Sequence, residues 1–165
     1  MKRLTDTLKL GLVSCCFLGC SPFAPGTVGT LGGVAIAWAL SGLSHYLEWS
    51  LGLAALIYVA TRPLGKWSEQ YAGEKDPGIF VMDEVIGYLI TIAWIGGPTP
   101  LALAVAFFVF RFFDIFKPKL ARRMEHIPGG DGILLDDAVA GVYGLVLVML
   151  PARLILHQLP WTVAG

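Results

Sequence analysis

Apolar and polar residues occur in alternating blocks along the chain. The apolar blocks cover residues 28–43, 51–61, 85–95, 101–113 and 138–156. Each block is long enough for about three to five helical turns. None of them shows the strict two-residue alternation that is typical of a half-buried strand. The pattern therefore predicts an all-α protein, a compact multihelical bundle of short hydrophobic helices, and we expect it to form a single domain over residues 1–165.

The lengths of these blocks bear on whether they cross a bilayer. A membrane-spanning helix needs about 20 apolar residues. Only residues 138–156 reach that length, and residues 28–43 come close to it. The overall composition is 56% hydrophobic and only 15% charged, with a mean hydropathy of +0.70. We therefore expect a membrane-associated protein whose helices are short, tilted or partly embedded.

The basic residues are confined to a few polar segments. Eleven of the twelve lysines and arginines lie in residues 2–9, 62–75 and 111–123, and the turns at 44–50 and 96–100 contain none. If the apolar helices cross a membrane, the positive-inside rule places these segments on the cytoplasmic side. The formal net charge is zero. No nucleic-acid partner is therefore expected, because such proteins carry a marked basic excess.

Carboxylates gather where polar segments meet apolar ones. The pairs Asp83–Glu84 and Asp136–Asp137 each precede an apolar run, and Asp114 closes another. A carboxylate at a helix start is an ordinary structural choice, because it complements the helix dipole. In so apolar a chain, however, unpaired carboxylates close to lipid are costly. Clustered acids without His or Cys suit a hard cation such as Mg²⁺, which commonly shares its coordination with a substrate phosphate.

A short basic and acidic series follows the fourth apolar block. Arg111, Asp114 and Lys117 are spaced three residues apart, so they lie on one broad face of a helix. Arg111 can hold a phosphate bidentately and Lys117 can supply a point charge. The structural alternative is an ion pair at the end of a buried helix. Together with the carboxylates, this series indicates Mg²⁺-assisted chemistry at a phosphate group.

A glycine- and threonine-containing segment precedes the first apolar block. The sequence FAPGTVGT at residues 23–30 predicts a turn that opens into a helix, with Thr27 or Thr30 as its cap. Backbone N–H groups at Gly26 and Thr27 would then be available to an anion. Close packing of glycines against a neighbouring helix is the structural alternative.

Three motifs together resemble the phosphatidylglycerophosphatase A family. They are FAPGTVGT at 23–30, KDPGIFVMDEVIG at 75–87, and FRFFDIFKPKLAR with GGDGILLDDAVAG at 110–141, so the resemblance spans nearly the whole chain. The resemblance implies a bacterial, Mg²⁺-dependent enzyme of the inner membrane, with its active site facing the cytoplasm. Such an enzyme hydrolyses phosphatidylglycerophosphate to phosphatidylglycerol and phosphate. The site residues that it implies are Asp83, Glu84, Arg111, Asp114, Lys117, Asp136 and Asp137.

The roles of these residues are hypotheses at this point. Asp83, Asp136 and Asp137 are expected to bind Mg²⁺, and Glu84 or Asp114 to act as a general base. The rival mechanism is a phospho-enzyme formed on Asp114 or Asp83. Arg111, Lys117, Gly26 and Thr27 are expected to bind the substrate phosphate.

Two other classes of protein are compatible with a strongly hydrophobic chain that carries clustered carboxylates. A small membrane transport or scaffold protein would use its carboxylates in ion pairs along the spans. A phosphatidyl-transferring enzyme resembles a different pattern, with acids four residues apart on one helix, which this sequence lacks. The expected partner is a phospholipid substrate in the membrane. The sequence leaves the formation of a homo-oligomer open.

Overall fold

The computed structural model describes residues 2–162, and the regular structure in that range is helical apart from one isolated bridge between Pro98 and Thr162. The α-helices are α1 (Lys2–Val13), α2 (Pro25–Leu40), α3 (Tyr46–Thr61), α4 (Gly65–Ala72), α5 (Met82–Ile92), α6 (Pro100–Phe116), α7 (Lys119–Met124), α8 (Gly130–Gly144) and α9 (Leu150–Ile155). Short 3₁₀ turns occupy Leu18–Cys20 and Arg62–Leu64, and a π-helical segment occupies Leu145–Met149. The predicted all-α class is confirmed.

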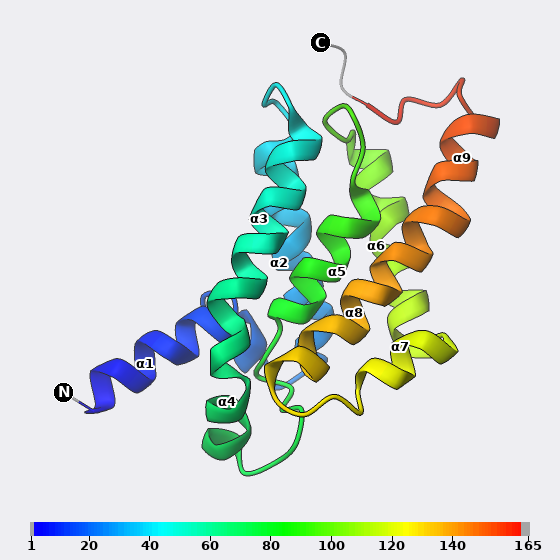
Figure 1. Cartoon of the computed structure of the whole chain (residues 1–165). Coiled ribbons are helices and arrows are strands. Elements are labelled where there is room, and N and C mark those ends of the chain that lie inside the picture. Colours follow the sequence, from blue (N-terminus) through cyan, green and yellow to red (C-terminus); the bar gives the residue numbers. More distant parts are fainter. Residues whose placement is uncertain (1, 163–165) are drawn as a thin grey trace.

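Helix α5 is the centre of the bundle. It has only 11 residues, yet all except Glu84 and Ile90 are buried. Helices α2, α3, α6 and α8 pack around it, while α1 projects away from the bundle at one end (Figure 1). A short helix that is apolar on every side is typical of a core element rather than a surface one. Side chains on α5 are therefore held by neighbours on all sides.

Glycines allow neighbouring helices to approach α5 closely. A Cβ atom at Gly141 of α8 would lie 2.3 Å from the carbonyl oxygen of Gly87, and one at Gly87 would lie 2.6 Å from the carbonyl oxygen of Asp137. On α2, a Cβ at Gly29 would lie 2.4 Å from the Cβ of Val81. Small residues at helix crossings permit this backbone contact, as in membrane helix pairs. The Gly87–Gly141 contact lies one turn away from Asp83 and Asp137, so it fixes how closely those side chains can converge.

Helices α8 and α9 and the π segment between them form one continuous helix, Gly130–Ile155, which is long and apolar enough to cross a membrane. Pro151 lies inside this helix, and helical structure continues past it to Ile155. The π turn immediately before Pro151 shifts the hydrogen-bond register, which accommodates a residue that has no N–H group.

Large apolar side chains cover much of the outside of the bundle. Trp38, Trp49, Leu56, Phe108 and Ile155 are each more than half exposed. A soluble monomer rarely exposes large contiguous apolar patches. The outer surface therefore agrees with an association with lipid.

Two predicted helix starts are wrong. Helix α2 begins at Pro25, so Thr27 and Thr30 lie inside it rather than capping it, and the Thr30 hydroxyl donates to the Gly26 carbonyl at 2.8 Å. Helix α8 begins at Gly130, so Asp136 and Asp137 lie well inside that helix rather than at its start. The apolar block that predicts this helix begins only at residue 138, eight residues after the helix itself starts. Glycine is needed at the first helical position, because a Cβ at Gly130 would lie 2.0 Å from the Arg62 carbonyl oxygen.

Candidate active site

A polar cavity of about 320 Å³ lies where one end of α5 meets α6 and α8. Its lining residues are Asp76, Pro77, Gly78, Phe80, Asp83, Glu84, Arg111, Asp114, Ile115, Lys117, Asp136 and Asp137. They come from three segments that are far apart in the sequence, namely the approach to α5, the end of α6 and the middle of α8. The two charged motifs that the sequence singled out thus form a single site.

Three carboxylates converge in this cavity. Oxygen atoms of Asp83, Glu84 and Asp137 lie within 4.8 Å of one another. Asp83 and Asp137 are 8% and 3% exposed, respectively. Within residues 2–162, Asp83 Oδ1, Glu84 Oε2 and Asp137 Oδ1 are buried without a hydrogen-bond partner. Buried carboxylate oxygens of this kind are costly unless a cation binds them, so the donor set fits a hard divalent ion such as Mg²⁺.

The pKa values of Asp83 and Glu84, the two acids of α5, are shifted because these carboxylates are buried and lie close together. Burial, with the added charge of Glu84, raises the pKa of Asp83 well above its ordinary value. Burial likewise raises the pKa of Glu84, with a contribution from the charge of Asp114. Like charges in a dry site favour proton uptake unless a positive ion is present. The protein by itself therefore holds these acids in an environment that favours either a proton or a metal ion.

The positive charges of the cavity are already paired with acids. Arg111 Nη1 donates to Asp114 Oδ2 at 2.5 Å, on the same turn of α6. Lys117 Nζ lies 2.6 Å from both Asp136 Oδ2 and Glu125 Oε1. Burial by itself lowers the pKa of Lys117, but its hydrogen bonds to Asp136 and Glu125 outweigh burial and raise it. Lys117 is thus held in its charged form at the edge of the carboxylate cluster.

Lys117 also occupies an unusual backbone conformation. It ends α6 with a φ of 25°, a region that L residues rarely adopt. Non-glycine residues in such conformations persist only where the surrounding structure holds them, and they concentrate at functional sites. The two ion pairs of Lys117 are contacts that hold it.

The start of α2 packs against two of the side chains that line the cavity. A Cβ atom at Gly26 would lie 2.3 Å from Glu84 Oε1 and 3.2 Å from Arg111 Nη1. Any side chain at this position would therefore have to displace the ends of Glu84 and Arg111. Neither Gly26 nor Thr27 is among the residues that line the cavity. The phosphate contacts expected for Gly26 and Thr27 stay predictions.

The arrangement changes the expected set of metal-binding residues. Asp83 and Asp137 lie together as predicted, but the third member of the cluster is Glu84 rather than Asp136. Asp136 instead pairs with Lys117, and its Oδ1 accepts the Asp137 backbone N–H at 2.9 Å. Adjacent residues of a helix point about 100° apart, so on α8 Asp137 faces the cluster while Asp136 turns toward Lys117, whereas on α5 both Asp83 and Glu84 belong to the cluster.

The structure adds residues that the motifs did not single out as site residues. Asp76 and Phe80 line the cavity, and Glu125 is a second partner of Lys117. Asp76 stands directly before the Pro77–Gly78 turn that leads to α5, so its place beside the motif was a usable signal. Glu125 lies in a polar stretch with no distinguishing spacing, and nothing in the sequence pointed to it.

Asp131 lies outside this cavity despite its place in the same motif. Its carboxylate accepts hydrogen bonds from Tyr58 and from Arg62 Nη2, the latter at 2.8 Å. These contacts tie the start of α8 to the end of α3. Asp131 is therefore a structural acid and not a member of the carboxylate cluster.

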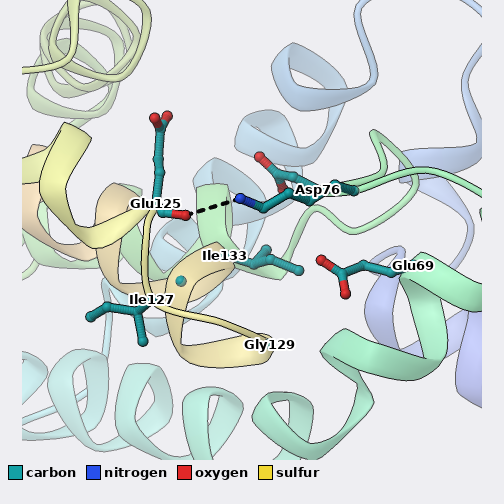
Figure 2. A pocket seen from close by; sticks show the side chains of 8 residues that line it. Glu69, Asp76, Glu125, Ile127, Gly129 and Ile133 are labelled. Atoms are coloured by element: carbon teal, nitrogen blue, oxygen red, sulfur yellow. Dashed lines mark hydrogen bonds between the residues drawn. The ribbon is translucent and has the colours of Figure 1, made fainter.

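A second cavity of about 230 Å³ adjoins the first through Asp76, which lines both. Glu69, Asp76 and Glu125 surround it, and the Lys75 ammonium donates to the Glu125 carbonyl oxygen at 3.4 Å (Figure 2). Three acids and one lysine line this cavity, and six acids and two bases line the first, so neither attracts a phosphate by net charge without a bound cation. The carboxylate cluster that could bind such a cation lies in the first cavity, together with Arg111 and Lys117.

These observations define a class of protein. Acids that served a transport path would be distributed along the helices, whereas these acids gather around one cavity at the end of an apolar bundle. Carboxylates, an arginine and a lysine around one cavity are the parts used to bind a metal ion and a phosphate. The chain is a membrane-associated enzyme of phosphate chemistry.

The chain belongs to the phosphatidylglycerophosphatase A family, whose family model matches residues 11–152. A Bacteroides thetaiotaomicron protein named "Putative phosphatidylinositol-3-phosphatase" is 39% identical over 79% of this chain and 84% of its own length. Proteins named phosphatidylglycerophosphatase A from Haemophilus influenzae and Escherichia coli are 34% and 32% identical. These matches cover 76% and 75% of this chain and 77% and 72% of the relatives. No solved structure matches the chain significantly.

Proposed function

We propose that this protein hydrolyses the terminal phosphomonoester of phosphatidylglycerophosphate, giving phosphatidylglycerol and inorganic phosphate. The observation that carries the proposal is the convergence of Asp83, Glu84 and Asp137 beside Arg111 and Lys117 in one cavity of a lipid-facing bundle. Family membership and two relatives of that name support the choice of substrate.

Mg²⁺ is the proposed cofactor, with Asp83, Glu84 and Asp137 as the residues that would hold it. When bound, it would supply positive charge that offsets the phosphate and polarises its P–O bonds. Asp136, which was expected among the ligands, orients Lys117 through their 2.6 Å contact. This division gives each acid of the pair on α8 a separate task.

The chain's own residues account for the remaining steps. Arg111 and Lys117 bind phosphate oxygens and neutralise charge as the new P–O bond forms. Asp114, at the cavity and outside the carboxylate cluster, accepts the proton of the attacking water. The bond between phosphorus and the glycerol oxygen then breaks, and that oxygen takes up a proton from solvent at the cavity mouth. A direct attack by the Asp114 or Asp83 carboxylate is the rival route, and it predicts a phospho-enzyme that can be trapped with labelled substrate.

Phosphatidylinositol 3-phosphate is a second candidate substrate, because the relative with the highest identity among those compared is named for that activity. The same cavity suits any phosphomonoester on a lipid headgroup, since the contacts described involve only the phosphate. Side-by-side assays with the two lipids distinguish the candidates. A higher kcat/KM for the inositol lipid would reassign the substrate without changing the site.

The proposed location is the bacterial inner membrane, with the cavity on the cytoplasmic side. The cavity lies at the end of the bundle that carries Arg111, Lys117 and the basic helix α7. Basic segments remain in the cytoplasm and are attracted to anionic headgroups. Arg123→Cys in a protein whose Cys15, Cys16 and Cys20 are replaced by serine tests this with a membrane-impermeant thiol reagent, since whole cells should protect the new cysteine and lysed cells should not.

The deciding assay measures phosphate release from phosphatidylglycerophosphate in mixed micelles, with and without Mg²⁺. Wild-type protein should be active only with the metal, and Asp83→Asn should be inactive. Asp131→Asn is the matched control, because Asp131 is an acid of the same region that lies outside the cavity. Absence of release by folded wild-type protein would refute the proposed function.

A further inference from the structure

An apolar groove of about 420 Å³ runs along the outer surface between α2 and α6. Its lining residues are Leu31, Val34, Trp38, Pro100, Leu103, Ala104, Phe107 and Phe108. Trp38 and Phe108 are 66% and 71% exposed, whereas Leu103 is 6% exposed. The groove thus has two projecting aromatic side chains and an apolar floor.

The two helices that form the groove are also two of the helices that reach the active site. Near the start of α2, Gly26 packs against Glu84 and Arg111, and near the end of α6, Arg111 and Asp114 line the cavity. Along both helices the groove begins within about two turns of those residues. The groove therefore leads away from the phosphate cavity along the side of the bundle.

The groove lies at the depth of the hydrocarbon of one lipid leaflet. At 1.5 Å per residue, the lining on α2 extends from about 7 Å to about 18 Å beyond Gly26. The lining on α6 covers a similar span, from about 4 Å to about 16 Å beyond Arg111. One leaflet of a bilayer has a hydrocarbon depth of about 15 Å. A lipid whose phosphate occupies the cavity would therefore have its hydrocarbon at the depth of the groove.

The geometry points to the α2–α6 groove as the binding site for an acyl chain of the phospholipid substrate. This inference rests on the proposed function, because it assigns the tail of a lipid whose phosphate is cleaved in the neighbouring cavity. Burial of methylene groups against Trp38, Leu103 and Phe107 supplies binding energy remote from the reacting phosphate. Only the headgroup of the lipid leaves the bilayer to enter the cavity, since the acyl chain remains at the lipid-facing surface.

A groove-filling variant tests this assignment. Ala104→Trp places a large side chain in the groove at an exposed position, so the core is not disturbed. The control is Ala55→Trp, the same substitution at an exposed position of α3, which does not line the groove. Each protein is assayed with dipalmitoyl and with water-soluble dihexanoyl phosphatidylglycerophosphate. Ala104→Trp should lower kcat/KM about tenfold for the long-chain lipid only, equivalent to losing roughly two buried methylenes.

A second measurement does not depend on a variant or on turnover. A phosphatidylglycerophosphate with a photoreactive diazirine on one acyl chain should label α2 and α6 of the wild-type protein, and unlabelled substrate should compete. Equal labelling of α3, or no competition, would overturn the assignment, as would an Ala104→Trp variant that keeps full long-chain activity or loses both activities equally. Wild-type protein that cleaves neither lipid would instead refute the proposed function itself.

Discussion

Charged side chains are buried at both ends of the bundle, but the hydrogen-bond partners of these side chains differ. At the end away from the active site, Arg153 of α9 is 4% exposed and donates to the carbonyl oxygens of Ala93 and Ile92 at 3.0 and 3.1 Å. Its guanidinium also lies 4.7 Å from the ring of Trp94. At the other end, Asp83, Glu84 and Asp137 leave buried oxygens without protein partners.

The difference separates a structural charge from a functional one. Arg153 satisfies the last carbonyls of α5, which no intrahelical N–H can reach, so it stabilises the end of the central helix. The three carboxylates stabilise nothing in the protein alone, because they repel one another. Burial of a charged side chain therefore does not by itself indicate a functional site. The convergence of several carboxylates without hydrogen-bond partners does indicate one.

The largest expected effect is a loss of stability on replacing Lys117, which pairs with the buried Asp136 at the active-site end of the bundle. Lys117→Met leaves Asp136, which is 3% exposed, without its cation. Breaking such a pair costs about 3–5 kcal/mol, and we expect the low end because Asp136 can take up a proton. Denaturant unfolding in detergent measures the loss.

The double variant Lys117→Met/Asp136→Asn separates the two roles of Lys117. It should recover most of the stability, because the buried charge of Asp136 is then absent and Glu125, the other partner of Lys117, is exposed enough for water to solvate it. It should remain poorly active, because the phosphate still lacks the lysine. Recovery of activity along with stability would show that Lys117 serves only to pair with Asp136.

The next effect is on activity at the carboxylate cluster. Asp137→Asn should lower Mg²⁺-dependent phosphate release by more than about 100-fold, since even residues one shell further from a metal commonly contribute 10–100-fold. Its thermal midpoint without Mg²⁺ should stay the same or rise, because one repelling charge is removed. A loss of activity explained by unfolding would contradict this interpretation of the cluster.

A smaller effect is expected at the opposite end. Arg153→Met leaves two buried carbonyl groups without donors, at about 1–3 kcal/mol for an unsatisfied group. The folded fraction should keep wild-type kcat and KM, because Arg153 lies at the far end of α5 from the cavity. Thermal unfolding and steady-state kinetics on the same preparation check both statements. A folded Arg153→Met protein without activity would contradict the assignment of Arg153 as a purely structural charge.

The smallest effect concerns pH. Because the pKa values of Asp83 and Glu84 are raised in the fold, the native state holds more protons than the unfolded state once the pH exceeds about 4. Stability contributed by these groups is therefore present at low pH and lost as the pH rises toward their raised values. In chelator, the thermal midpoint should fall by a few degrees between pH 5 and pH 8. Mg²⁺ should abolish most of that fall, and Asp83→Asn should reduce it.

Several features of the site could be predicted from the sequence because they depend on local pattern. The motif around Asp83 and Glu84 precedes an apolar run, and the structure places both residues in the first turn of α5. Arg111, Asp114 and Lys117 were expected on one helix face, and all three line the cavity. The sequence left open whether these residues form ion pairs instead of a site. The structure shows both, because Arg111 and Lys117 are ion-paired and also line the cavity.

Other features depend on contacts between segments that are distant in the sequence. Glu84 belongs to the carboxylate cluster and Asp136 does not, because Asp136 pairs with Lys117, a residue that lies 19 positions earlier in the sequence. Helix α8 starts six residues before Asp136 because glycine at position 130 fits against the Arg62 carbonyl oxygen. No local spacing contains this information.

The sequence by itself determined the all-helical class, the lipid-facing character and the set of charged side chains, because these follow from composition, from the length of each apolar segment and from the absence of strand-like alternation. The tertiary structure decided which oxygens converge. That choice depends on how closely α5 and α8 approach through Gly87 and Gly141 and on which acids find a basic partner. Distances of a few ångströms between separate helices set both, and they decide which of these carboxylates can share one metal ion.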